Sequence, residues 1–340
     1  MRKIFTVSLL LMTIAYVLPF VYQGVGSGGG LKVDWPQWQS DEQQQTEETA
    51  QGGREETTVS VLTEGEVRDI PMTDYLAGVL AAEMPAGFPE EALRAQAVAA
   101  RTYTYYKIQA LENGGSNDAA HQGAVVCDDY THCKAYLDLE TRARERWGDQ
   151  AEEYTEILYD AVESTAGEIV TYEEQPIAAV FHSTSSEKTE SAEDVWGSAY
   201  PYLVSVDSPG GEDSPEYEKD VTFSAEEFRK IMQEQYPTMD LSGAPNTWFA
   251  DSNRSEAGGV IDVEVGGVRV KGTQIRTLLG LNSTNFTLTT TGDSITFHTI
   301  GYGHGVGLSQ YGAKALAEQG KTYAEILAWY YPGTTLEKVS

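Results

Sequence analysis

The chain has 340 residues, enough for one large domain or two closely joined ones. Lysine and arginine total 23, whereas aspartate and glutamate total 52, so the formal net charge is −29. This balance argues against nucleic acid and anionic membrane surfaces as partners, because both would be repelled. A neutral polysaccharide is compatible with it.

The first residues have the composition of a membrane segment. Arg2 and Lys3 precede an apolar run over residues 4–22, close to the roughly 20 residues that cross a bilayer. No obvious small-residue cleavage site follows, so we expect residues 1–23 to be a transmembrane anchor that exports the rest of the chain. A cleaved signal peptide is the alternative, since residues 25–27 are small.

Residues 24–56 are rich in glycine, glutamine, glutamate and threonine, with DEQQQTEETAQGGREE at their centre. They contain little to bury, so we expect a disordered, acidic and glutamine-rich spacer there. The folded domain is expected over residues 57–340.

Helices alternate with hairpins in this domain. A helix is predicted to end at Met84, because Pro85 disfavours helical geometry in the residue before it, and the next helix runs from Pro89 to about Lys107. Mixed helices and antiparallel hairpins predict an α+β fold. The other predicted elements are hairpins over 57–70, 259–271 and 286–301, a strand pair within 168–186, and helices within 141–165, after 271, and over 309–320 and 322–333.

A lone glutamate, Glu83, ends the first helix among small and apolar neighbours. Unpaired helix carbonyls and apolar surroundings both favour the protonated acid, the form that protonation of a glycosidic oxygen requires. The alanine-rich helix behind it carries Arg94 and Arg101 on one face, seven residues apart. The alternative is a solvated surface glutamate, which is common at helix ends.

The chain's only two cysteines, Cys127 and Cys133, are six residues apart, with His121 before the first and His132 adjoining the second. An exported pair of this spacing permits a disulfide. The flanking histidines favour a zinc ion held by His121, Cys127 and Cys133, with the fourth position open to water or to His132. Thiolate-rich zinc sites are usually structural.

Two polar stretches are candidates for ligand binding. In GYGHGVGLSQYGA, residues 301–313, four glycines surround His304. They permit positive φ and a close approach of the backbone to a ligand; a structural turn with a hydrogen-bonded histidine is the alternative. In FHSTSSEKTE, residues 181–190, His182, Ser183 and Ser185 follow a strand.

Aromatic residues lie just after the second stretch. Trp196, Tyr200 and Tyr202 occur within VWGSAYPYL. Exposed rings of this kind stack on sugar faces, so this segment is a further candidate for binding a polysaccharide.

Three stretches in this order resemble the stage II sporulation protein D family: YLAGVLAAEMPAGFPEEALRAQAVAARTYTY, AVFHSTSSEKTESAEDVWGSAYPYL and GYGHGVGLSQYGAKALAEQGKTYAEILAWYYPGT. The resemblance implies that the domain over 57–340 is a lytic transglycosylase that cleaves peptide-stripped peptidoglycan during engulfment in endospore formation. It implies a membrane-anchored protein outside the cytoplasm, in the mother-cell membrane facing the forespore. The partners it implies are the amidase stage II sporulation protein P, and stage II sporulation protein M.

The resemblance also assigns roles to residues. Glu83 falls in the family's EMP motif as catalytic acid. Arg101 matches the arginine of the alanine-rich helix and is implied to be the second catalytic residue, which would stabilise the developing charge. The spacing of the cysteines and histidines resembles that of members with one zinc ion. The residues implied to line the substrate groove are Ser183, Ser185, His304, Gln310 and Tyr311. Trp196 and Tyr302 are further candidates for binding the substrate.

A single carboxyl group is enough for such an enzyme, whereas most glycosidases use two. After Glu83 protonates the bond between N-acetylmuramic acid and N-acetylglucosamine, the 6-hydroxyl of the sugar attacks C1 and leaves a 1,6-anhydro end. Two rival classes stay open: a non-catalytic amidase enhancer that binds wall glycan, and a zinc-dependent wall amidase or peptidase.

Overall fold

The structure, a computed structural model, describes residues 57–115 and 119–339. These residues belong to one compact unit. The predicted anchor over 1–23 and spacer over 24–56 lie outside the described residues. In the described ranges, no helix is both long and apolar enough to cross a membrane.

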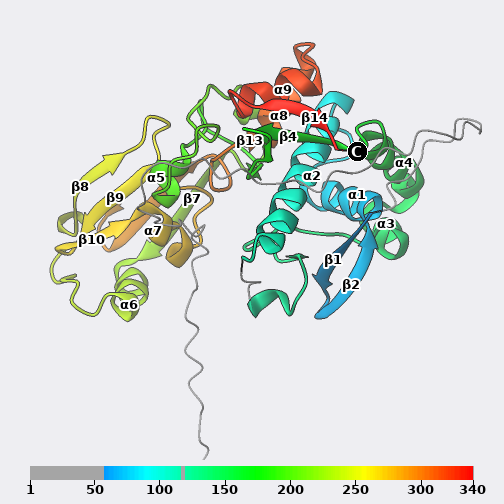
Figure 1. Cartoon of the computed structure of the whole chain (residues 1–340). Coiled ribbons are helices and arrows are strands. Elements are labelled where there is room, and N and C mark those ends of the chain that lie inside the picture. Colours follow the sequence, from blue (N-terminus) through cyan, green and yellow to red (C-terminus); the bar gives the residue numbers. More distant parts are fainter. Residues whose placement is uncertain (1–56, 116–118, 340) are drawn as a thin grey trace, which may run out of the picture. The chain divides into compact units, whose positions relative to one another are not determined.

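The predicted α+β class is confirmed (Figure 1). The described residues have two hydrophobic clusters, and the larger one, which we call the first cluster, is built from both ends of the unit. Its helices are α1 (Met72–Glu83), α2 (Glu90–Glu112), α3 (Leu139–Trp147), α4 (Ala151–Glu163), α5 (Ala192–Trp196), α8 (Gln310–Glu318) and α9 (Tyr323–Tyr330). Its strands are β1 (Thr58–Thr63), β2 (Glu66–Pro71), β3 (Val126–Cys127), β4 (Glu168–Tyr172), β5 (Gln175–Pro176), β6 (Phe181–His182), β13 (Leu308–Ser309) and β14 (Thr335–Lys338).

Helix α2 is the centre of the first cluster, in contact with α1, α4, α8, α9 and β4 (Figure 1). Its small side chains let these elements approach closely, because alanine adds little bulk beyond the backbone. The helix continues past Lys107 to Glu112, because no helix-breaking residue occurs before Gly114. The buried alanines are Ala92, Ala95, Ala97, Ala99 and Ala100.

Short strand pairs bring distant segments together. Strand β6 pairs in parallel with β13, with Phe181 opposite Leu308 and His182 opposite Ser309. The two polar stretches of the sequence therefore lie side by side. The other sheets of this cluster have the orders β2-β1-β3 and β14-β4-β5.

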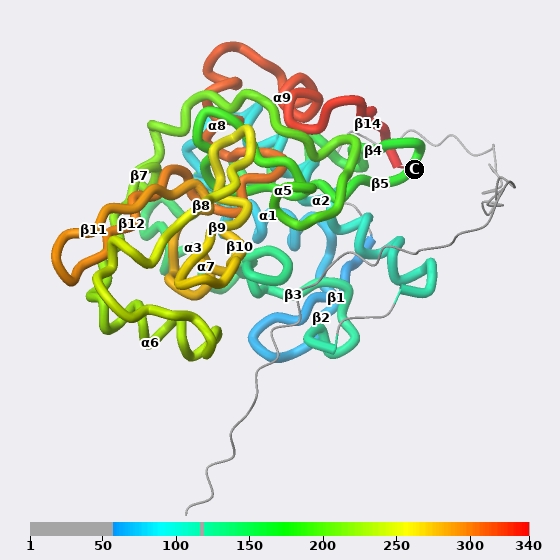
Figure 2. The backbone as a smooth tube through the Cα atoms, turned by 90° about the vertical axis from the view of Figure 1, so that its left-hand side faces the viewer, coloured from blue at the N-terminus to red at the C-terminus, as the bar shows by residue number. Residues whose placement is uncertain are grey.

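Residues 218–300 are inserted between these segments and form the second cluster. Its two sheets have the orders β10-β9-β8 and β11-β12-β7 (Figure 2). The hairpins predicted here are confirmed, whereas β7, α6 and β8 were not predicted. Its elements are β7 (Glu218–Ser224), α6 (Ala225–Gln235), β8 (Phe249–Arg254), β9 (Val260–Val265), β10 (Val268–Lys271), α7 (Gly272–Leu279), β11 (Phe286–Thr291) and β12 (Ser294–Ile300).

The start of helix α6 could have been predicted from the sequence. Ser224 and Glu227 form a capping box, in which each side chain bonds to the other residue's backbone N–H. The remaining short elements in the described residues are the 3-10 turns η1 (Ala119–His121), η2 (Gly148–Gln150), η3 (Gly211–Asp213) and η4 (Pro245–Thr247).

Candidate active site

Glu83 is the last residue of α1. The next residue, Met84, is extended, with φ −126° and ψ 146°, as expected before Pro85. The Glu83 side chain is half-buried. Its Oε1 accepts a hydrogen bond from the backbone N–H of Ala135 at 3.1 Å, and its Oε2 accepts a long one, 3.5 Å, from Nε2 of Gln310. Three segments that are far apart in the sequence therefore converge on this carboxyl group.

A buried cation, Lys134, is part of the same region. Its ammonium group lies 3.6 Å from the ring centroid of Phe181 and 4.9 Å from that of Tyr103. Burial lowers the pKa of Lys134 to about 8, partly offset by the negative charges of Glu83 and Cys133. Sequence reasoning missed Lys134, because nothing in its spacing distinguishes it from a surface lysine.

The surroundings of Glu83 are therefore more polar than the sequence indicated. Two N–H groups donate to its carboxyl oxygens, and its charge interacts with the ammonium group of Lys134. That the acid is protonated before reaction stays a prediction.

Arg101 has a different environment from the one expected of a catalytic residue. Its side chain is completely buried. The guanidinium group donates to the carbonyls of Val162 and Glu168, at 3.0 and 3.3 Å, and at 3.4 Å to the hydroxyl of Thr165. These acceptors lie at and just beyond the C-terminal end of α4, where helix carbonyls lack helical partners. The geometry therefore favours a structural role for Arg101, tying α2 to α4, over the catalytic role predicted from the sequence.

Ser185 and His182 form a buried pair in the FHSTSSEKTE stretch. Nδ1 of His182 donates to the carbonyl of Val306 at 3.1 Å, so Nε2 accepts from the hydroxyl of Ser185 at 2.7 Å. Burial lowers the pKa of His182 to about 3, so its imidazole is neutral. Ser183 is less buried, and its carbonyl accepts from the N–H of Tyr311 at 3.1 Å.

His304 packs between two other rings. Its centroid lies 5.5 Å from that of His182 and 5.3 Å from that of Trp196. Its Nδ1 accepts from the N–H of Val306 at 3.1 Å, and burial lowers its pKa well below the usual value. The prediction of unusual backbone conformations around His304 is confirmed, with positive φ at Gly301, Gly303, Gly305 and Gly307.

Helix α8 presents the remaining predicted residues of this region. Ser309 caps its N-terminus by accepting from the N–H of Gly312 at 3.3 Å. Gln310 is buried beside Glu83, and the ring of Tyr311 packs edge-on against Phe88 at 5.1 Å. Tyr302, by contrast, leaves 43% of its surface exposed.

The predicted metal ligands converge, and they gain a fourth member. His121, Cys127, His132 and Cys133 offer ligand atoms that all lie within 4.8 Å of one another. Nε2 of His121 lies 3.2 Å from Sγ of Cys133, and Nδ1 of His132 lies 3.3 Å from Sγ of Cys127. The cysteines are free thiols rather than a disulfide. Two imidazoles and two thiols fit tetrahedral zinc, with His132 in the position that the sequence left open.

Other acidic groups near these motifs are already engaged. Glu190, 6% exposed, accepts from the N–H of Gly259 at 3.0 Å and so ties the second cluster to the FHSTSSEKTE stretch. Glu91 pairs with Arg94 at 2.8 Å, and Glu90 also pairs with Arg94. These contacts give each of the three glutamates a structural function.

Comparisons with known proteins agree with these observations. Residues 37–172 match the family described as Stage II sporulation protein. The chain is 42% identical over 272 residues to stage II sporulation protein D of Bacillus subtilis, covering 80% of this chain and 76% of that protein. Stage II sporulation protein D of Bacillus amyloliquefaciens is 39% identical over the same shares. An amidase enhancer of Bacillus subtilis is 29% identical over 77% of this chain and 40% of its own length. The chain belongs to the stage II sporulation protein D family.

Proposed function

We propose that this chain is a lytic transglycosylase that cuts peptide-stripped peptidoglycan between N-acetylmuramic acid and N-acetylglucosamine and leaves 1,6-anhydro ends. The observation that carries the proposal is the half-buried carboxyl group of Glu83. Its hydrogen-bond partners in the described residues are the N–H groups of Ala135 and Gln310 rather than a second carboxyl group. Glycosidases that use water usually need two carboxyl groups.

In the first step, protonated Glu83 gives its proton to the glycosidic oxygen, and the bond from C1 of the muramic acid to this oxygen breaks. In the second step, the 6-hydroxyl oxygen of the same sugar bonds to C1, and its proton passes to the Glu83 carboxylate. The N–H groups of Ala135 and Gln310 stabilise the carboxylate between the two steps. Glu83 ends as it began, so one residue serves as acid and then as base.

The two histidines near the glycine-rich stretch do not fit the acid's role. His182 holds its proton on Nδ1 through the carbonyl of Val306, and burial keeps it neutral. His304 is likewise held neutral by burial. His182 uses both ring nitrogens within the fold and orients the hydroxyl of Ser185. The residues assigned to binding and orienting the sugar strand are Ser183, Ser185, Trp196, Tyr302, His304, Gln310 and Tyr311.

A structural zinc ion is part of the proposal. His121, Cys127, His132 and Cys133 would hold it, and four protein ligands leave no position for the water that a zinc-dependent amidase or peptidase needs. When bound, zinc would cross-link the chain segments that carry these four ligands. Lys134 and Ala135 directly follow the ligand Cys133. A zinc ion that holds Cys133 in place would therefore also hold the ammonium group of Lys134 and the N–H of Ala135 near Glu83.

The setting follows from the family and the N-terminal composition. We propose that residues 1–23 anchor the protein in the mother-cell membrane, with its domain on the side that faces the forespore. Stage II sporulation proteins P and M would be its partners there, with protein P removing the peptides beforehand. The 29% identity to an amidase enhancer supports the alternative of a glycan-binding protein that stimulates another enzyme without cleaving.

Product analysis tests the mechanism. Purified, peptide-free glycan strands are digested with the parent protein, and the products are analysed by mass spectrometry. Anhydro ends are expected, each 18 Da lighter than the hydrolysed end because no water is added. Reducing ends alone would mean hydrolysis, and no cleavage by the parent would favour the amidase enhancer.

Metal removal tests the zinc assignment. We expect about one zinc per chain by elemental analysis, and a chelator is expected to lower both the thermal midpoint and glycan cleavage. The matched variant Cys127→Ser should reproduce both losses. Cleavage of stem peptides that zinc restores would instead indicate a catalytic metal and contradict the structural role.

A further inference from the structure

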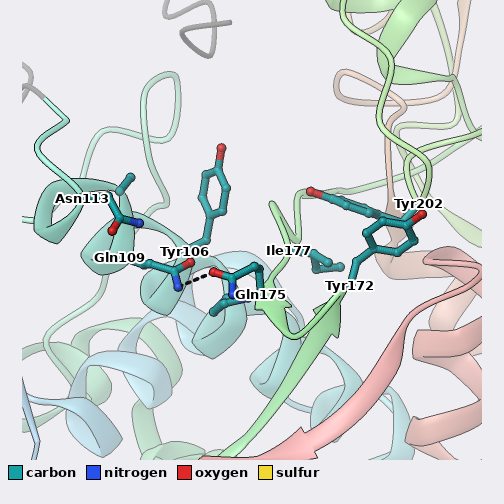
Figure 3. Close-up of a pocket in the computed structure, with 9 residues that line it drawn as sticks. Tyr106, Gln109, Asn113, Tyr172, Gln175, Ile177 and Tyr202 are labelled. Carbon is teal, nitrogen blue, oxygen red and sulfur yellow. Dashed lines mark hydrogen bonds between the residues drawn. The ribbon is translucent and has the colours of Figure 1, made fainter. Parts of the chain in front are cut away.

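A cavity of about 340 Å³ lies between the C-terminal half of α2 and the β4–β5 hairpin. Glu83 is not among the residues that line it. Tyr106 and Gln109 of α2, with its C-cap residue Asn113, lie on one side, and Tyr172 and Tyr202 lie on the other (Figure 3). Its volume lies within the range of about 300–1,000 Å³ that is usual for sites of small ligands.

The backbone sets these side chains facing one another. Residues 106, 109 and 110 of α2 and its C-cap residue 113 follow the three- and four-residue spacing of one helix face. Across the cavity, Tyr172 pairs with Gln175 around a two-residue turn of Glu173 and Glu174, both with positive φ, 51° and 63°. Such turns prefer asparagine and glycine, so this hairpin keeps an unfavourable turn sequence at the edge of the cavity.

The chemistry of the lining is that of a sugar site. In a chain of net charge −29, none of the residues that line this cavity is charged. Tyrosine rings offer apolar faces with a hydroxyl at the edge, and the amides offer both donors and acceptors. Nε2 of Gln109 donates to Oε1 of Gln175 at 2.7 Å. This leaves the side-chain carbonyl of Gln109 and the second N–H of its amide for a ligand.

A row of tyrosines leads from the cavity to Glu83. The ring of Tyr106 lies 6.4 Å from that of Tyr103, and Tyr103 contacts the ammonium of Lys134. From Tyr103 to Gln109, α2 rises about 9 Å. A linear ligand that lies along this helix face would extend from the cavity toward Glu83.

We propose that this cavity binds an N-acetylated sugar of the glycan strand, some units away from the bond that faces Glu83. The inference rests on the proposed function for the identity of the strand, and on the cavity's uncharged aromatic and amide lining for the class of ligand. The site makes long strands bind more tightly than short ones, because only a long strand fills both this cavity and the position at Glu83.

Calorimetric titration of the full chain in detergent tests this. The protein carries Glu83→Gln so that the probes stay intact, and the probes are the trimer and the hexamer of β-1,4-linked N-acetylglucosamine. We expect the hexamer to bind more tightly than the trimer. Tyr106→Ala and Gln175→Ala should each reduce that advantage by about 2- to 10-fold, as expected for one aromatic or amide contact.

The matched control is Tyr154→Ala, which removes a half-buried tyrosine of α4 that packs on Trp147. It should leave the advantage of the hexamer unchanged. No such advantage in the parent, or one that survives both cavity variants with the fold intact, would overturn the proposal. If Glu83→Gln still cleaves glycan while Tyr106→Ala removes the advantage, the proposed function fails and the sugar site stands.

Discussion

Glu83 and Arg101 come from one motif-bearing stretch, and the resemblance assigned catalysis to both, but the fold treats them differently. The Glu83 carboxyl group is half-buried and is met by donors from two distant segments. The Arg101 guanidinium is completely buried and donates to the carbonyls of Val162, in the last turn of α4, and of Glu168, at the start of β4. A charged residue in a motif is available for chemistry only where part of it stays open to a ligand. Otherwise the same residue type serves the fold.

The largest effect that separates the two residues is expected at Glu83. Glu83→Gln keeps the shape of the side chain and an acceptor oxygen for Ala135 or Gln310, but it has no proton to give. Glycan cleavage is expected to fall by about 10²- to 10⁴-fold. The thermal midpoint should stay within a few degrees of the parent's. Retained cleavage would remove Glu83 from the mechanism.

Arg101→Ala is expected to act on stability instead. It leaves the carbonyls of Val162 and Glu168 without this donor, and it leaves a cavity in the first cluster. The free energy of unfolding is expected to fall by about 2–4 kcal/mol, measured by chemical denaturation. Cleavage per folded molecule should change little.

The control for Arg101 is Arg142→Ala, on α3. The Arg142 side chain is 49% exposed and contacts Glu145 at 3.7 Å, so we expect a change within about 0.5 kcal/mol. If the Arg101→Ala protein is fully folded and still loses most of its cleavage, Arg101 would be catalytic after all. The contrast between Glu83 and Arg101 would then fail.

Much of this could be predicted because its signals are local. Pro85 fixes the end of α1 and so the place of Glu83, and the glycines around His304 adopt the expected positive φ. Lys134 and the N–H of Ala135 could not be predicted, since their approach to Glu83 depends on the path of the chain after Cys133. The hydrogen bonds of Arg101 could not be predicted for the same reason: its partners begin 61 residues further along the chain, and only the packing of α2 on α4 reveals them.

A pH measurement extends the comparison to His182. Its pKa is about 3 in the folded protein against 6.5 ordinarily. Between these values the unfolded chain binds a proton on this residue that the folded chain does not, so stability falls as the pH falls below about 6.5. By pH 5 this residue should cost the parent about 1–2 kcal/mol relative to pH 7. His182→Gln should flatten the pH dependence by that amount, and equal slopes for the two proteins would contradict it.

The smallest effect is expected at Lys134, which combines features of both residues: it is buried like Arg101 and lies near Glu83. Lys134→Met keeps an unbranched apolar stem against Phe181 and Tyr103 and removes the charge. Because burial of an ammonium group costs free energy, the variant should unfold at the same or a higher temperature. Cleavage should nevertheless fall by about 3- to 10-fold, through kcat rather than KM, because the Glu83 carboxylate loses a nearby positive charge after it gives up its proton.

Two measurements separate this charge effect from damage elsewhere. Because Lys134 adjoins the proposed zinc ligand Cys133, the zinc content of the variant has to be measured. It should equal that of the parent. Lys230→Met, at an exposed position of α6 in the second cluster, should leave both stability and cleavage nearly unchanged. A Lys134→Met protein that cleaves like the parent would mean that only the N–H groups of Ala135 and Gln310 support the carboxylate, and Lys134 would then belong with Arg101 among the structural charges.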